Sequence, residues 1–414
     1  MDGYFTGSAL IKITMNKFIK YLLLPHVIFL VMTALSFICW SIPDFNGSIR
    51  KGFNSGVIIS SKGLLIALFW ISLVSFTSAS GFKIGKFIKF NNKIINEKAN
   101  IDDSRPLKIL IFLALVGVAY VYLNVISSLG LAGIISAISG GQANALKEAL
   151  YADYSPGLPS LRYIAIPAGA LGMYHIIRGR YISLSIISIF LLLLVSIVSS
   201  RLSIVYAVFI FLGLIARNRQ INISFWKILL GFTILLHVIF ALNYSRNINF
   251  YRKIGIDNFY LAGISEVVAY LGSPFQGFLA VSESPGRFSN ITEIDTHTRV
   301  DISEELTTNS AFLELVREDN IYSAMLRIAW ITFISSILMS VSWRNGNNLI
   351  VLVFGALGYC FAEIWRINLF SQGIVFTIVL GIVLAVIICL SWPRLKRSSY
   401  SRKISLLKYK RRSI

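Results

Sequence analysis

The sequence predicts an all-α fold: a polytopic integral membrane helical bundle of about ten transmembrane helices. The chain of 414 residues is 56% hydrophobic and 14% charged, with a mean hydropathy of +0.71, whereas a soluble domain carries about 25% charged residues. Apolar segments recur at the length of about 20 residues that a helix needs to cross the hydrocarbon layer. Basic residues gather in alternate connections between them. This composition argues against a water-soluble enzyme, a nucleic-acid binder and a disordered protein.

Ten segments are predicted to span the membrane, because each is mostly apolar over a sufficient length. In chain order they are 21–42, 57–79, 107–129, 161–177, 181–199, 202–216, 225–243, 322–343, 349–361 and 369–392. The first is longer than the 7–15 residues of a signal-peptide core and lacks a small-residue cleavage site, so we expect it to remain as a spanning helix. The two shortest, 202–216 and 349–361, leave open a broken helix or one packed inside the bundle.

The charges orient the bundle. With a cytoplasmic amino terminus, ten crossings return the carboxyl terminus to the cytoplasm. Most of the 39 Lys and Arg residues then lie on the inner side, and most of the 19 Asp and Glu residues lie outside, as the positive-inside rule requires. The basic tail, 393–414, is interpreted as a topology anchor that contacts anionic lipid. The net charge of +20 therefore predicts no nucleic-acid partner.

The chain is expected to form a single membrane domain, 1–414, with two outer loops. The first, 130–160, is rich in small residues and is broken at Gly140-Gly141, which suits a re-entrant or interfacial segment. In the large loop, 244–321, apolar residues from Ile264 to Leu271 repeat at helical spacing. They predict a short amphipathic helix along the membrane surface, ended by Gly272-Ser273-Pro274. A loop of this length is more often a lid or a binding element than a connection without function.

Arginines on the outer side are not explained by topology. A cation near or below the membrane boundary is costly and marks a function unless a neighbouring acid pairs it. Arg201 is the sharpest case, because the helix after it, 202–216, rises only ~22 Å in a layer of ~30 Å. It should therefore lie in a pocket sunk into the membrane. The outer arginines are Arg162, Arg201, Arg246, Arg252, Arg287, Arg299, Arg317, Arg327 and Arg366.

Two short patches place such arginines among polar and aromatic residues. Arg246 and Arg252 follow Tyr244 in a stretch that also holds amide side chains. That composition suits a sugar phosphate, since Arg binds phosphate in a bidentate manner and aromatic faces cover sugar rings; the alternative is snorkelling to lipid headgroups. Glu363 and Arg366 are three residues apart on one helical face, so a plain ion pair is equally open.

Residues 363–368, Glu-Ile-Trp-Arg-Ile-Asn, resemble a patch of the Wzy-type O-antigen, or oligosaccharide repeat-unit, polymerases. The same family is resembled by two further short patches, Tyr-Leu-Gly-Ser-Pro at 270–274 and Ser200-Arg201 between closely spaced helices. The layout of the chain is also similar, with about ten spans and a long outer loop after the seventh helix. The resemblance implies a GT-C-like glycosyltransferase in the bacterial inner (cytoplasmic) membrane, with both termini cytoplasmic and its active site periplasmic. Such an enzyme transfers a glycan chain from undecaprenyl diphosphate to the non-reducing-end sugar of an undecaprenyl-diphosphate-linked repeat unit.

The resemblance also implies roles for residues and partners. Outer arginines of the family hold the diphosphates, which makes Arg201 a catalytic candidate and assigns substrate binding to Arg246, Arg252, Arg299 and Arg366. Glu266 and Glu363 are catalytic candidates as carboxylates that deprotonate the acceptor, with Asp257 and Asp295 unranked beside them. Tyr244, Tyr270 and Asn368 are expected to contact the glycan or diphosphate. The expected partners are the lipid-linked donor and acceptor and membrane lipids, and a chain-length regulator stays open.

Other functions remain open from the sequence. An O-antigen ligase would use the same donor with a lipid-core acceptor. A lipid-linked oligosaccharide flippase or transporter would place charges at the bilayer midplane on broken helices, often in two related halves, whereas here the unexplained cations gather at one face. Glu293, Asp295 and His297 form a weak metal-ligand pattern in an exposed loop, so we expect no metal and no cofactor.

Overall fold

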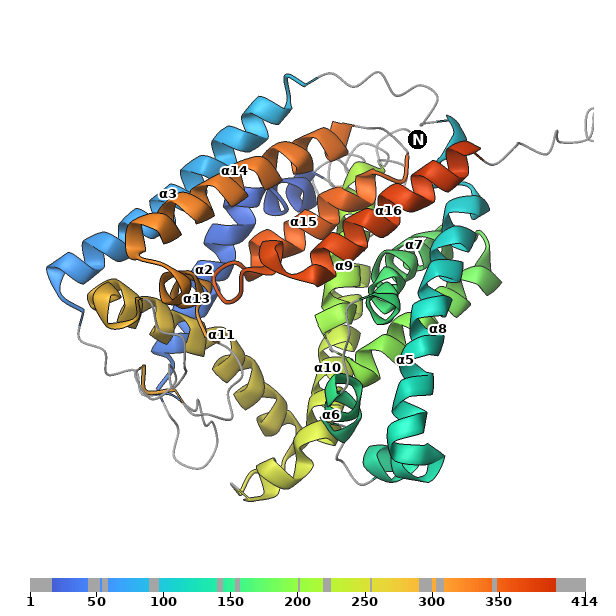
Figure 1. The fold of residues 1–414 in the computed structure, drawn as a ribbon, viewed down its shortest axis with the longest axis horizontal. Coiled ribbons are helices and arrows are strands. Elements are labelled where there is room, and N and C mark those ends of the chain that lie inside the picture. The colour runs from blue at the N-terminus through green and yellow to red at the C-terminus, as the bar shows by residue number, and fades with distance from the viewer. Residues whose placement is uncertain are drawn as a thin grey trace, which may run out of the picture.

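A computed structural model of the protein describes residues 17–43, 53, 59–88, 97–139, 144–152, 157–199, 202–218, 225–253, 255–289, 300–302, 309–344 and 348–391. These residues form a helical bundle (Figure 1). Extended pairing within them is limited to isolated bridges, which join Phe53 to Ile302 and Asn100 to Asn348. The prediction of an all-α fold is therefore confirmed.

The helices follow the predicted apolar segments in order. They are α2 (Pro25–Ser41), α3 (Ser61–Gly85), α5 (Ser104–Ser139), α6 (Asn144–Ala152), η1 (Leu158–Ile164), α7 (Ala165–Ile177), α8 (Ile182–Val198), α9 (Leu202–Arg217), α10 (Phe225–Lys253), α11 (Phe259–Glu283), η2 (Pro285–Arg287), α13 (Ala311–Glu318), α14 (Ile321–Arg344), α15 (Val351–Glu363), η3 (Leu369–Ser371) and α16 (Gly373–Ser391). Of these, α3, α5, α11, α14 and α16 are long and apolar enough to cross a membrane. The number of ten crossings stays a prediction.

Both expected outer loops begin as helix. Helix α10 continues past the predicted end at residue 243 to Lys253, and Gly255, with a φ of 78°, follows in the turn after it. Tyr244 and Arg252 consequently lie on a helix and not in a loop. Helix α5 likewise continues beyond Gly130, whose φ of 69° kinks it, as far as Ser139. A glycine accepts this positive φ without the cost that a side chain would add.

The prediction of a short surface helix that ends at Gly272-Ser273-Pro274 is wrong. Helix α11 has 25 residues and continues through Pro274 to Glu283. The small residues serve close packing, because a Cβ on Gly272 would lie 2.7 Å from the Phe53 ring and 3.1 Å from the Trp40 nitrogen. A proline inside a helix removes a single backbone hydrogen bond, which the surrounding contacts outweigh here. The loop does contain a short amphipathic helix elsewhere, α13.

One end of the bundle is basic. Helices α3 and α14 run parallel, since the Thr77 and Thr332 hydroxyls lie 2.7 Å apart and a Cβ on Gly85 would lie 2.6 Å from the Ser340 side chain. Arg217, at the end of α9, lies over the ring of Trp343 near the end of α14. We call this the basic end; its described cations include Lys83, Lys86, Arg105, Arg178, Arg217 and Arg344.

Helix α15 lies at the centre, in contact with α2, α9, α14 and α16 (Figure 1). All 13 of its residues are buried. It begins near the basic end and runs antiparallel to α9, because the Tyr206 and Tyr359 rings lie 4.3 Å apart and Gly213 packs against Gly355. Thirteen residues rise only ~20 Å, which is short of the ~30 Å layer. The segment 349–361 therefore forms a short helix packed inside the bundle.

Candidate functional site

The candidate site begins where α15 ends. Arg366 lies in the turn after the helix, and its backbone nitrogen donates to the Glu363 carbonyl over 2.8 Å. Its Nε donates to Glu363 Oε2 over 2.6 Å, and both side chains are 7% exposed. The ion pair that the three-residue spacing left open is therefore present. The formal charge of Arg366 is balanced by this neighbour, so any further role must use its remaining donors.

Those remaining donors are on Nη1 and Nη2. A guanidinium has five N–H donors, and within the described part of the chain Arg366 makes a hydrogen bond only from Nε, to Glu363. The guanidinium lies over the Tyr270 ring of α11, with Cζ 4.4 Å from the ring centroid, a cation–π arrangement. Buried polar groups are usually hydrogen-bonded. The Nη groups of Arg366 are thus fixed in orientation and open to an acceptor from a ligand.

Asn368 adds a second open group beside the same turn. Asn368 is 4% exposed. Its side-chain oxygen, Oδ1, is buried with no hydrogen-bond partner among the described residues. Arg366 and Asn368 are two residues apart, both are buried, and both have hydrogen-bonding groups that are not used. Such a pair indicates a binding site more than a packing contact. The structure thus brings together four predicted site residues: Glu363, Arg366, Tyr270 and Asn368.

Glu314 is a carboxyl at this site that the sequence analysis did not single out. It lies in the first turn of α13. Burial raises its pKa, and the backbone N–H of Asn368 and the guanidinium groups of Arg366 and Arg317 oppose that rise in part. The sequence offers no clear signal for it, because Leu313 and Leu315 are buried but adjacent residues of a helix point in different directions, and Glu314 itself is half-buried.

Glu266 belongs to a second cluster on the same helix. It lies one turn before Tyr270 on α11, and residues four apart share a helical face. The Tyr251 hydroxyl of α10 donates to Glu266 Oε2. The Tyr244 ring stacks on the Tyr251 ring, with centroids 6.1 Å apart and planes at 9°. Tyr244 and Glu266 are therefore joined through Tyr251. This group lies next to Glu363, Arg366, Tyr270 and Asn368, which we call the Arg366 cluster, because Glu266 and Tyr270 are neighbours on α11.

The other predicted site residues are not placed in this cluster. Arg252 is exposed on α10. Arg201, Arg299, the weak metal pattern at 293–297, the basic tail and the side chain of Arg246 lie outside the described residues. Helix α9, which follows Arg201, begins at the end of the bundle where α15 ends, because the two helices are antiparallel and Tyr206 packs on Tyr359.

Two other outer arginines are held by the protein. Arg327 pairs with Glu318 over 2.6 Å and with Asp319 over 3.2 Å, in partly exposed positions. Arg162 is 1% exposed; it donates to the Pro159 carbonyl over 2.7 Å and to the Tyr163 hydroxyl over 2.8 Å. These contacts fasten η1 and the α13–α14 connection, so they give both arginines a structural role.

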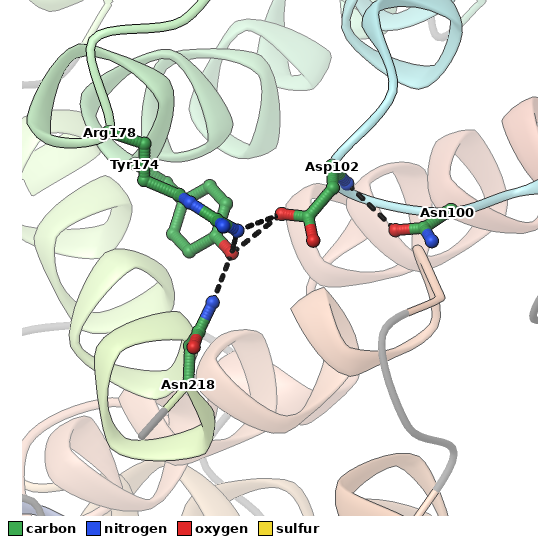
Figure 2. A network of polar contacts seen from close by, with 5 residues as sticks. All are labelled: Asn100, Asp102, Tyr174, Arg178 and Asn218. Atoms are coloured by element: carbon green, nitrogen blue, oxygen red, sulfur yellow. Dashed lines mark hydrogen bonds and ion pairs between the residues drawn. The ribbon is translucent and has the colours of Figure 1, made fainter. Parts of the chain in front are cut away.

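The basic end holds a larger polar network, which Figure 2 shows. The Tyr174 hydroxyl donates to Asp102 over 3.0 Å and accepts from Arg178 over 2.8 Å and from Asn218 over 2.6 Å. Arg178 also pairs with Asp102, whose backbone nitrogen donates to Asn100 over 2.9 Å. The network joins the ends of α7 and α9 to the segment before α5, and its members satisfy one another. It is a structural clamp, unlike the Arg366 cluster.

Comparisons with known proteins add no assignment, because the chain matches no protein-family model, no curated protein and no solved structure.

Proposed function

We propose that the protein is a membrane glycosyltransferase of the Wzy kind, which polymerises lipid-linked oligosaccharide repeat units. It transfers a glycan chain from undecaprenyl diphosphate to the non-reducing-end sugar of an undecaprenyl-diphosphate-linked repeat unit. The observation that carries the proposal is the Arg366 guanidinium, which is buried, fixed by Glu363 and Tyr270, and open at both Nη groups.

This arrangement suits a diphosphate better than a bare anion. The planar guanidinium binds two phosphate oxygens at once, which an ammonium does not. Because Glu363 balances the formal charge, Arg366 contributes directed hydrogen bonds more than net charge. Donors fixed before the reaction stabilise the negative charge that develops on the departing oxygen, and the lipid diphosphate is already an activated leaving group. Metal and nucleotide cofactors are not required for this step.

The depth of the site agrees with a lipid-linked substrate. The end of α15 lies ~20 Å from its start near the basic end, so Arg366 would lie below the surface of a ~30 Å layer. A diphosphate attached to a polyprenyl chain reaches that depth while its lipid stays in the bilayer. Holding donor and acceptor in one groove would supply much of the remaining rate enhancement.

The proposed orientation places the basic end in the cytoplasm and the Arg366 cluster on the periplasmic side of the bacterial inner membrane. The cations at the ends of α3, α7, α9 and α14 support it under the positive-inside rule. Helix α11 begins next to the end of α10, where Ala262 packs with Tyr251, and ends beside Ser60, where Glu283 accepts from the Ser60 hydroxyl over 2.9 Å. Its two ends then lie on the periplasmic side, which leaves about ten crossings in the other helices and both termini inside.

The experiment is reconstitution of the purified protein in liposomes with undecaprenyl-diphosphate-linked repeat units as the only glycan. A polymerase produces a ladder of longer lipid-linked glycans. A ligase produces no ladder until a lipid A-core acceptor is added. A flippase moves the substrate across the bilayer at unchanged length. Either of the last two results would replace the polymerase assignment.

A further inference from the structure

The start of helix α9 lies beside the Arg366 cluster. The Tyr206 ring of α9 packs 4.3 Å from the Tyr359 ring of α15, and the two helices are antiparallel. Ser203 is three residues before Tyr206, and Glu363 is four residues after Tyr359. Residues at these spacings share a helical face, so Ser203 and Glu363 lie in the same seam between α9 and α15. The amino end of α9 therefore adjoins the turn that carries Arg366.

Two hydroxyl groups in this seam are buried without a hydrogen bond. Ser203 is 1% exposed and Tyr359 is 2% exposed, and neither hydroxyl has a hydrogen-bond partner among the described residues. The Tyr206 hydroxyl, by contrast, lies 3.6 Å from the Cys360 sulfur. Most buried polar groups are hydrogen-bonded, because one that has no partner destabilises the fold. A ligand that accepts hydrogen bonds would satisfy both hydroxyls.

The polar groups around this seam are hydrogen-bond donors. Both hydroxyls can donate, and Arg366 has Nη1 and Nη2, which make no hydrogen bond within the described part of the chain. Ser203 lies in the first turn of α9, a helix of 16 residues, whose first N–H groups have no acceptor within the helix. The helix dipole makes this end positive, which favours an anion. Such a set of donors matches the oxygens of an ionised diphosphate, which only accept hydrogen bonds.

We propose that the amino end of α9, through Ser203, and the Tyr359 hydroxyl of α15 hold the lipid diphosphate together with Arg366. This inference rests on the proposed function, which supplies the ligand, and it adds two binding residues that carry no charge. Arg201 directly precedes α9, so the diphosphate contact expected for it from the sequence would lie at the same helix end.

The test is Tyr359→Phe, which removes the hydroxyl and keeps the ring packed on Tyr206. The purified protein is titrated in detergent with undecaprenyl diphosphate, and Tm is measured with and without this ligand. We expect the affinity to fall roughly tenfold or more, because a hydrogen bond to a charged group is lost. Without ligand, the Tm should equal or exceed that of the wild type, because a buried hydroxyl without a partner has been removed.

The Tm separates a hydroxyl that binds a ligand from a structural one. A lower Tm without ligand and an unchanged affinity would show that the Tyr359 hydroxyl bonds within the protein, to its charged neighbour Glu363 one turn on, and would overturn its role. Ser203→Ala is a second, independent variant and should also bind undecaprenyl diphosphate more weakly with no loss of Tm. Unchanged affinity in both variants would refute the site.

The matched control is Tyr206→Phe, which removes a hydroxyl of the same aromatic pair that contacts Cys360. Its affinity should stay within about twofold of the wild type. An equal loss in Tyr206→Phe would mean that the packing of the two rings, and not the Tyr359 hydroxyl, supports binding. Glycan lengthening by the wild type with normal binding in both site variants contradicts only this inference. Weaker binding in both variants with no lengthening by the wild type contradicts only the polymerase function.

Discussion

The Arg366 guanidinium lies over the Tyr270 ring with Cζ 4.4 Å from its centroid, although the two residues come from different helical segments. Tyr270 belongs to α11, and Arg366 follows α15. The Glu363 carboxylate accepts a hydrogen bond from Nε, and the Tyr270 ring contacts one face of the guanidinium, so the group is held on two sides. The contact between Arg366 and Tyr270 therefore sets the direction in which Nη1 and Nη2 point.

Replacing Tyr270 should weaken donor binding. A desolvated cation–π contact contributes about 2 kcal/mol, so Tyr270→Ala is expected to weaken the affinity for the lipid diphosphate by roughly 30-fold. Tyr270→Phe keeps the ring and should lose much less. The affinity is measured by titration of the reconstituted protein with undecaprenyl diphosphate. Equal losses in the two variants would mean that the ring face does not orient Arg366.

Breaking the buried pair should destabilise the fold. Glu363→Ala leaves Arg366 buried without its carboxylate, a change that costs about 3–5 kcal/mol. The matched control is Glu318→Ala, which breaks a partly exposed pair with Arg327 and should cost at most about 1 kcal/mol. Thermal unfolding in detergent compares them. Similar small shifts of Tm in both variants would argue that Glu363 is not the required partner of Arg366.

The close contact between α9 and α15 should not tolerate a side chain. A Cβ on Gly355 would collide with the backbone at Ile210, so Gly355→Ala must separate the helices, at about 1–3 kcal/mol. Gly231→Ala is the control, because no atom lies within 4 Å of its added Cβ and Ala favours helix by about 1 kcal/mol. We expect a lower Tm and slower polymerisation for Gly355→Ala alone. A stable, active Gly355→Ala protein would contradict this packing.

Arg201 should be essential if it holds a diphosphate, as its position before a short helix predicts. Arg201→Ala is expected to abolish polymerisation while the protein still accumulates in the membrane. Arg201→Lys should rescue poorly, because an ammonium lacks the planar fork. The readout is the length distribution of the surface glycan. Normal long chains from Arg201→Ala would remove this residue from the mechanism.

The sequence predicts the fold well where hydropathy alone decides. The start of α9 agrees with prediction and its end lies within one residue, and α15 is shifted by two residues at each end. The continuation of α10 to Lys253 could not be predicted, because that polar stretch is helical through tertiary contacts such as Tyr251 with Glu266. The end predicted at Gly272 was wrong for a related reason: a helix-stop pattern and a close-packing pattern use the same small residues.

In the candidate site, too, local sequence patterns indicate some contacts, whereas others depend on tertiary packing. The three-residue spacing places Glu363 and Arg366 on one helical face and left their ion pair open as one of two roles; the structure shows that the pair forms. The approach of Tyr270 to Arg366 depends on how α11 packs, which no local pattern encodes. Glu314 could not be singled out, because the burial that raises the pKa of its carboxyl is set by tertiary structure.

The most direct test of the account is polymerisation by Arg366→Lys in liposomes, with Arg327→Lys as the matched control. The lysine preserves a positive charge beside Glu363, so the protein should keep a Tm near that of the wild type. It lacks the fixed Nη donors, so the rate of glycan lengthening should fall by at least about 100-fold, while Arg327→Lys stays close to wild type. Wild-type lengthening by Arg366→Lys would contradict the proposal that this guanidinium holds the departing diphosphate.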